Sequence, residues 1–185
     1  IDDALITITS NLETTRFSAD VQNYPGNPLM AFRANVEGEL VPRGANVDVK
    51  LYDADDKLGI RLGAEAEIAK DSLLLRLTPE TPVIGYKEYH LNSDNYLCVH
   101  EKNKITTDIQ LVADDGTGLK IYSMPNDEAL QDLSLTINRF DLTELTAILP
   151  YLPNITGYLE GDMHYVQSED KMTIASDIGI RNMTY

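Results

Sequence analysis

Apolar and polar residues alternate with a period of two through most of the chain. The stretch 30–40 is an example, in which apolar residues fall on one face: Met30, Phe32, Ala34, Val36 and Leu40. Successive side chains of a β-strand point to opposite sides, so a period of two is typical of a strand with one buried face. The pattern predicts an amphipathic strand here.

Further aliphatic rows of the same kind recur along the chain. They lie within 47–51, 58–68, 73–77, 105–111, 119–121, 133–137, 155–163 and 172–180. Short segments rich in Gly, Pro, Asn and Asp separate the rows, which suits β-hairpins. We therefore expect a mainly β fold, an antiparallel meander of long amphipathic strands. In the irregular stretch 78–96, Pro79 and Pro82 predict an edge strand, because proline lacks the N–H that a central strand needs.

One segment departs from the strand pattern and predicts a short helix at about 141–149. Its apolar positions share one helical face: Leu142, Leu145, Ile148 and Leu149. Asp141 can cap the helix, with Glu144 three residues later as in a capping box. Pro150 and Pro153 end it. We expect this helix to lie as a lid over an open end of the sheet.

The strand after the predicted helix carries two glycines on its apolar side. Gly157 and Gly161 leave gaps in the apolar row, which a helix or a bend of the chain could fill.

An antiparallel sheet with one apolar face has to bury that face. A closed sandwich or barrel would pack it against a second layer, whereas a curled groove or an incomplete barrel would leave it open to acyl chains. The residues alone leave both architectures open.

The charge of the chain excludes some classes of partner. The formal net charge is −15, which argues against nucleic acid and against adsorption to an anionic membrane surface. The chain contains no Trp and three Phe, so aliphatic residues dominate the predicted interior. Cys98 has no second cysteine with which to form an internal disulfide.

Motifs that carry catalytic or metal chemistry do not emerge from the sequence. The acidic segment 53–59 lacks the Gly and the closing Glu of a calcium loop and predicts a hairpin turn. The three histidines have no spacing typical of a zinc site. Cys98 and His100 would share a strand face as a conceivable nucleophile pair, but no third partner accompanies them. We therefore expect no enzyme activity, no cofactor and no metal.

Two segments resemble a known family. The segment 133–165 reads LSLTINRFDLTELTAILPYLPNITGYLEGDMHY, and 89–111 contains N-S-D-N before a strand. They are similar to units of the AsmA-like and TamB (translocation and assembly module) superfamily of bacterial envelope proteins, in which a strand ends in a DL-x-x-L-x-x-x-L-P helix and a G-x-L-x-G strand follows. The matching residues are Asp141, Leu142, Leu145, Leu149, Pro150, Gly157, Leu159 and Gly161.

The resemblance implies a location, a shape and a role. Family members are anchored in the inner membrane of Gram-negative bacteria, with bodies in the periplasm built of long sheets curled into a β-taco groove. They are implicated in moving phospholipids between the inner and outer membranes and in assembling outer-membrane proteins with an Omp85-type barrel. No enzyme activity or cofactor comes with the family.

We therefore expect residues 1–185 to form a single β domain, a fragment of a larger envelope protein whose apolar groove contacts phospholipid acyl chains. The predicted groove lining is Leu73, Leu75, Leu77, Ile109, Leu111, Leu119, Ile121, Leu135, Ile137, Leu159 and Ile174. The predicted lid residues are Leu142, Leu145, Ile148 and Leu149. The alternative is a structural or interaction module that pairs with strands of a client or partner protein.

Overall fold

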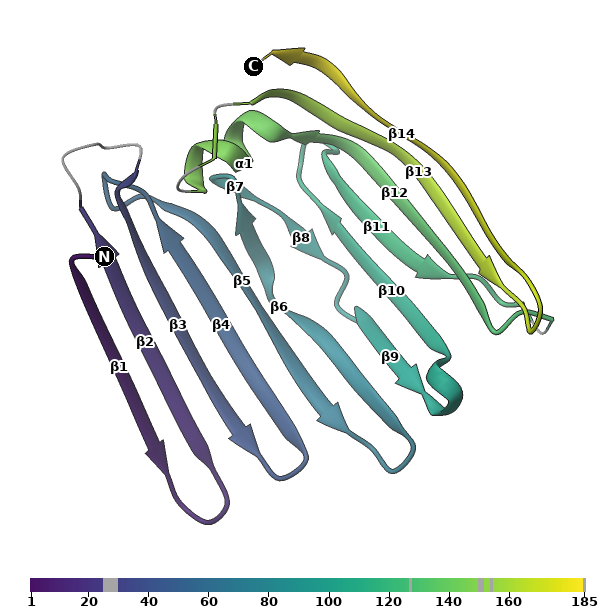
Figure 1. Ribbon diagram of the computed structural model, residues 1–185, viewed down its shortest axis with the longest axis horizontal. Coiled ribbons are helices and arrows are strands. Elements are labelled where there is room, and N and C mark those ends of the chain that lie inside the picture. The colour runs from purple at the N-terminus through teal and green to yellow at the C-terminus, as the bar shows by residue number, and fades with distance from the viewer. Residues whose placement is uncertain (25–29, 127, 150–151, 154, 185) are drawn as a thin grey trace.

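The computed structural model consists of one large, open β-sheet and one short α-helix (Figure 1). It describes residues 1–24, 30–126, 128–149, 152–153 and 155–184. The strands are β1 (Asp3–Ser10), β2 (Thr15–Asn23), β3 (Phe32–Val41), β4 (Gly44–Tyr52), β5 (Leu58–Ile68), β6 (Ser72–Ile84), β7 (Lys87–Glu88), β8 (His90–Leu91), β9 (Tyr96–His100), β10 (Ile105–Val112), β11 (Gly118–Ser123), β12 (Gln131–Asp141), β13 (Thr156–Gln167) and β14 (Met172–Thr184). The helix α1 (Leu142–Ile148) follows β12, and a short 3₁₀ turn, η2 (Glu101–Asn103), follows β9.

The strands form an antiparallel meander in which most strands pair with their neighbours in sequence. The order across the sheet is β1-β2-β3-β4-β5-β6-β9-β10-β11-β12-β13-β14. The short β7 pairs with β6, and β8 pairs with β10, so the segment from β7 to β9 acts as one interrupted strand between β6 and β10. The predicted fold class is confirmed: a mainly β, open antiparallel meander with a single short helix among the described residues.

The registers bring the aliphatic rows onto one surface, called the apolar face below. Val36 pairs with Val49, and Val49 pairs in turn with Leu62. Ile121 pairs with Ile109 on one side and with Leu135 on the other. Directly paired residues of antiparallel strands share a face, so the rows merge from β1 to β14. The opposite, polar face carries cross-strand ion pairs, among them Arg16–Glu39 and Arg61–Asp48.

The sheet curls with its apolar face inward near the end where α1 lies. The rings of Tyr89 and Phe140 stack with their centroids 5.9 Å apart. Tyr89 immediately precedes β8, and Phe140 belongs to β12, so β10 and β11 lie between them in the sheet. Three strand spacings span ~14 Å in a flat sheet. The two side chains meet because the sheet bends toward them.

The prediction of an edge strand around Pro79 and Pro82 is wrong, because β6 lies in the middle of the sheet. The pairing of β5 with β6 passes from Gly63↔Thr78 directly to Arg61↔Val83. Residues 79–82 therefore bulge out opposite a single residue of β5. A bulge has unpaired backbone positions, so it tolerates proline in a central strand just as an edge does.

Two asparagine side chains hold the interrupted strand in place. The amide of Asn95 accepts a hydrogen bond from the Leu77 N–H (2.8 Å) and donates one to the Leu77 carbonyl (3.3 Å). The amide of Asn92 accepts from the Gln110 N–H (2.9 Å) and donates to the Asp108 carbonyl (3.2 Å). Each amide thus replaces a peptide group of the missing strand. The N-S-D-N motif therefore has a structural role between β8 and β9.

Candidate functional site: the apolar face and its helix

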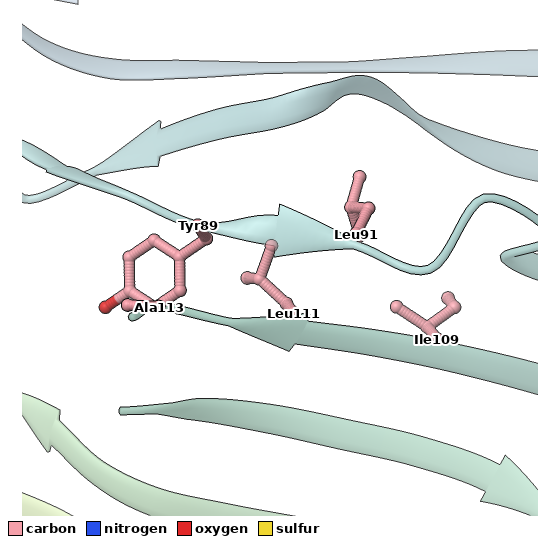
Figure 2. Packing of buried hydrophobic residues seen from close by; sticks show 5 residues of the cluster. All are labelled: Tyr89, Leu91, Ile109, Leu111 and Ala113. Atoms are coloured by element: carbon pink, nitrogen blue, oxygen red, sulfur yellow. The ribbon is translucent and has the colours of Figure 1, made fainter. Parts of the chain in front are cut away.

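The centre of the apolar face is a packed hydrophobic core. Figure 2 shows its buried members along β8 and β10: Tyr89, Leu91, Ile109, Leu111 and Ala113. Partly buried residues of the neighbouring strands pack against them: Leu77, Ile84, Leu97, Leu119 and Phe140. Four predicted lining residues, Leu77, Ile109, Leu111 and Leu119, therefore belong to this core. Leu111 is only 3% exposed, so nothing outside the protein contacts it in this conformation.

The flanks of the apolar face are open. On β1, Ile6 and Ile8 are each 68% exposed, and on β14 Ile174 is 56% exposed. The end of the central strands away from α1 is open as well, and we count it with the flanks: Leu73 of β6 is 36% exposed and pairs with Ile68 of β5, which is also exposed. Among the described residues, no second layer covers these flanks. Leu73 and Ile174 are thus the predicted lining residues that solvent or a ligand reaches first.

The remaining predicted lining residues are half-buried and connect the centre to the flanks. They are Leu75, Ile121, Leu135, Ile137 and Leu159. Their registers place them on the apolar face with the others: Leu75 pairs with Leu97, and Leu159 pairs with Ile180. The predicted lining residues therefore share one face, but they differ in whether a ligand could reach them.

The helix α1 begins at the predicted Asp141 cap, but Glu144 in its first turn does not form the predicted capping box. Asp141 has extended backbone angles, and its carboxylate accepts a hydrogen bond from the Thr143 N–H (2.8 Å), which caps the helix. The Glu144 carboxylate lies 4.0 Å from the Lys87 ammonium instead of bonding the backbone N–H of Asp141, as a capping box requires. Thr146 donates to the Leu142 carbonyl and lies within hydrogen-bond distance of the Ile155 carbonyl, which holds the segment after the helix. Pro150 lies outside the described residues.

Two glycines outside the helix, Gly59 and Gly85, lie against it, and we call them the docking site of α1. Ile148 is 3% exposed and fills the space over Gly59, where a Cβ would overlap its Cδ1 atom. Gly85 and Tyr86 both have positive φ (61° and 62°) in the tight turn between β6 and β7, and a Cβ on Gly85 would lie 2.9 Å from the Glu144 Cβ. The helix backbone therefore rests directly on this turn.

The docked helix joins two distant parts of the sheet (Figure 1). Gly59 belongs to β5 and α1 follows β12, so five strand spacings, ~24 Å in a flat sheet, separate the two. A helix of seven residues spans only ~10 Å, so the curl of the sheet has to supply the rest. The helix thus crosses one end of the curled sheet. Of the predicted lid residues, Ile148 is buried, and Leu142, Leu145 and Leu149 are half-buried.

Charges gather around the helix-covered end of the sheet. Burial, followed by the carboxylates of Glu144, Asp115 and Asp141, raises the pKa of Tyr89 to about 12. The Thr117 backbone N–H, followed by Lys87, lowers the pKa of Asp115 to about 2. Lys87 is 3.0 Å from Asp115, so it contacts carboxylates of both the helix and the β10–β11 turn. The contacts of Lys87 therefore link α1 to the β10–β11 turn.

The candidate nucleophile pair, Cys98 and His100, lies on the polar face, and the acidic segment 53–59 lies in a turn. Cys98 Sγ is 3.9 Å from His100 Nδ1, and the other ring nitrogen lies 2.7 Å from Thr106 Oγ1. Asp53 accepts hydrogen bonds from the N–H groups of Asp55 and Lys57, so the segment 53–59 forms the predicted turn. Within the described ranges, no cluster of three or more His, Cys, Asp or Glu could hold a metal ion.

Hollows in the surface are lined mainly by polar-face residues, and of the predicted lining residues Ile137 borders the second hollow described here. One, of about 710 Å³, has Glu39, Glu65 and Arg76 in its walls. Another, of about 480 Å³, lies over Asp162, Asp177 and Arg181. Acidic and basic side chains are mixed in both, so neither selects one class of ligand by charge. The open flanks of the apolar face lie on the opposite side of the sheet from Glu39, Glu65 and Arg76.

Comparison with known proteins adds no family assignment: no family model, no curated protein and no solved structure matches the chain. The resemblance of 133–165 therefore stays a prediction that rests on its motifs. In the part of the chain that the structure describes, no helix has the length and apolar character to cross a membrane.

Proposed function

We propose that the apolar face binds phospholipid acyl chains, as a non-enzymatic periplasmic segment of a TamB/AsmA-like protein that passes phospholipid between the inner and outer membranes. One observation supports this best. A continuous aliphatic face runs across the whole sheet, and its flanks have no covering layer among the described residues. Monomeric soluble proteins rarely expose large contiguous apolar patches, and larger ones mark binding surfaces.

The mechanism is passive solvation. Burial of an acyl methylene against side chains such as Leu73 and Ile174 stabilises it by ~0.8 kcal/mol, while the headgroup stays in water. Because the face is open and aliphatic, it distinguishes poorly between one acyl chain and another. The binding therefore selects for acyl chains as a class and leaves lipid identity to other parts of the protein.

The location and partners follow from the resemblance and are part of the proposal. An inner-membrane anchor in the full-length protein, a periplasmic body and an Omp85-type barrel partner suit a protein that handles lipid or nascent outer-membrane strands. The net charge of −15 suits these partners, because it keeps the chain away from anionic membrane surfaces while the apolar face takes up single lipids.

A photo-crosslinker at Leu73 tests the proposal, with the crosslinker at Leu74 as the matched control. The two leucines are adjacent in β6, and alternation places Leu73 on the apolar face and Leu74 on the polar face, opposite Cys98. With zwitterionic vesicles of phosphatidylethanolamine and phosphatidylcholine, which do not repel the acidic chain, we expect lipid adducts from position 73 and few from position 74. Equal capture at both positions, or protein adducts alone at position 73, would contradict lipid binding by this face.

The open edges of the sheet favour a second candidate, an interaction module that adds a strand from a client or partner. Among the described strands, β1 pairs only with β2, and β14 pairs only with β13. A proline at an edge position such as Ile6 would impair strand addition and leave lipid capture at Leu73 unchanged. A charge at Leu73 would have the opposite effect.

A further inference from the structure

The strand β14 is a long edge that, up to Arg181, lacks the lysine, proline and bulges that usually protect an edge against pairing. It has 13 residues, all of them exposed, and its only partner among the described strands is β13. Edge strands usually carry lysine, proline or inward-pointing charges that discourage a second strand. β14 contains neither lysine nor proline, and Ile174, Ile178 and Ile180 form its apolar row. The backbone groups on its outer side pair with no described strand and can serve as a template for another strand.

The middle of β14 is self-complementary in charge. Residues 177–181 read Asp-Ile-Gly-Ile-Arg, which is symmetric about Gly179 except that the two ends have opposite charges. In an antiparallel pair of two copies centred on Gly179, Asp177 faces Arg181 of the second copy, and the reverse pair forms as well. Ile178 and Ile180 face each other twice on the apolar side.

Other registers lose this match. A pair centred on Asp177 or on Arg181 would place like charges opposite each other. A pair centred on Ile178 or Ile180 would place both charges opposite uncharged residues of β14. A slip by one residue would place the apolar row of one copy opposite the polar row of the other. The centre at Gly179 is therefore the register that pairs both charges.

The groups required for this pairing are available. Asp177 has no ion pair among the described residues. Arg181 binds Glu160 through Nε at 2.6 Å, and its guanidinium carries further N–H donors that can reach a second carboxylate. A Cβ built on Gly179 meets no atom within 4 Å. Asn182 has a φ of 52° at a bulge, which limits the regular edge to the residues up to Arg181.

We propose that β14 pairs with β14 of a second copy of this chain, across a two-fold axis through Gly179. Paired residues share a face, so the apolar faces of both copies lie on the same side and form one continuous surface. This interface does not rest on the proposed lipid binding, and a dimer would exist whether or not the surface binds lipid.

A cysteine at the two-fold axis tests the register. In a Cys98→Ala background, Gly179→Cys places two thiols opposite each other with Cα atoms ~4.5–5.5 Å apart, within disulfide range. Ala175→Cys is the matched control, since the two copies of residue 175 would lie ~27 Å apart along the strands. Under mild oxidation we expect a disulfide dimer from Gly179→Cys and little from Ala175→Cys. Equal cross-linking of both variants, or of neither, would overturn the proposal.

Charge reversal gives a second measurement that does not need a disulfide. Asp177→Arg and Arg181→Asp should each weaken dimerisation about tenfold or more in sedimentation equilibrium, because each places like charges opposite each other. The double variant should restore most of the affinity. A monomeric parent chain at all concentrations would refute the dimer, and so would a double variant as weak as the single ones. Loss of association on Ile6→Pro would show that β1 is the partner strand and would also overturn it.

Discussion

The centre and the flanks of the apolar face contain the same kinds of residue and differ in what covers them. Leu111 in the centre is 3% exposed, whereas Ile174 on the β14 flank is 56% exposed. Both lie on amphipathic strands with the same alternation. The difference arises because the sheet curls around Tyr89 and Phe140 and because α1 docks on Gly59 and Gly85. The centre therefore stabilises the fold, and the flanks stay exposed, which the proposed lipid binding requires.

The largest expected contrast is between alanine substitutions in the two regions. Leu111→Ala should destabilise the protein by about 2–5 kcal/mol, because it leaves a cavity in a packed core. Ile174→Ala should cost less than about 1 kcal/mol, because its side chain is mostly in water already. Urea denaturation monitored by circular dichroism measures both. Similar losses for the two variants would show that the flank is also packed.

The docking of α1 should depend on the absence of a side chain at residue 59. Gly59→Val should destabilise the protein by about 1–3 kcal/mol, because the new side chain takes the space of Ile148. Hydrogen exchange at 142–148 should rise with it. Gly179→Ala is the control, since a Cβ there meets open space and should change stability little. Unchanged exchange in Gly59→Val would mean that the helix docks elsewhere.

The interrupted strand at the centre should depend on its asparagine amides. Asn95→Ala removes the side-chain groups that bond both the N–H and the carbonyl of Leu77, and it should cost about 1–2 kcal/mol. Asn138→Ala also removes one hydrogen bond, to the Gly116 carbonyl, but at an exposed site, and should cost less than about 0.5 kcal/mol. Chemical denaturation of the two variants compares them directly. Equal losses would argue that burial at the centre adds nothing.

The smallest expected effect concerns the charges beside the helix. The Thr117 N–H and then Lys87 hold the pKa of Asp115 at about 2, below the ordinary value of ~3.9. Because this pKa is lowered, the stability it contributes is present above pH ~4 and is lost as the pH falls through about 2. Lys87→Gln should raise the pKa of Asp115, as measured by NMR titration of its carboxyl carbon. An unchanged pKa would assign the shift to the turn backbone alone.

The sequence predicts those features that depend on local periodicity. The period-two rows predict the strands and their common face, and the Asp141 cap with its apolar spacing predicts α1. The division into a packed centre and open flanks is not predictable in this way, because it depends on contacts between strands far apart in sequence, such as Tyr89 with Phe140. The docking site of α1 is not predictable for the same reason, although Gly85 indicates the tight turn between β6 and β7. Pro79 and Pro82 give a wrong prediction of an edge strand, because a bulge in a central strand tolerates proline as an edge does.

The central claim is that acyl chains contact the open flanks of the apolar face. The chain has no tryptophan, so a single introduced one reports on one position. Leu73→Trp and Leu74→Trp place that probe on the apolar and polar faces of the same strand. With phospholipids brominated in their acyl chains, we predict strong quenching of the fluorescence of Leu73→Trp and little quenching of Leu74→Trp. Equal quenching of the two, or no quenching of Leu73→Trp, would contradict the claim.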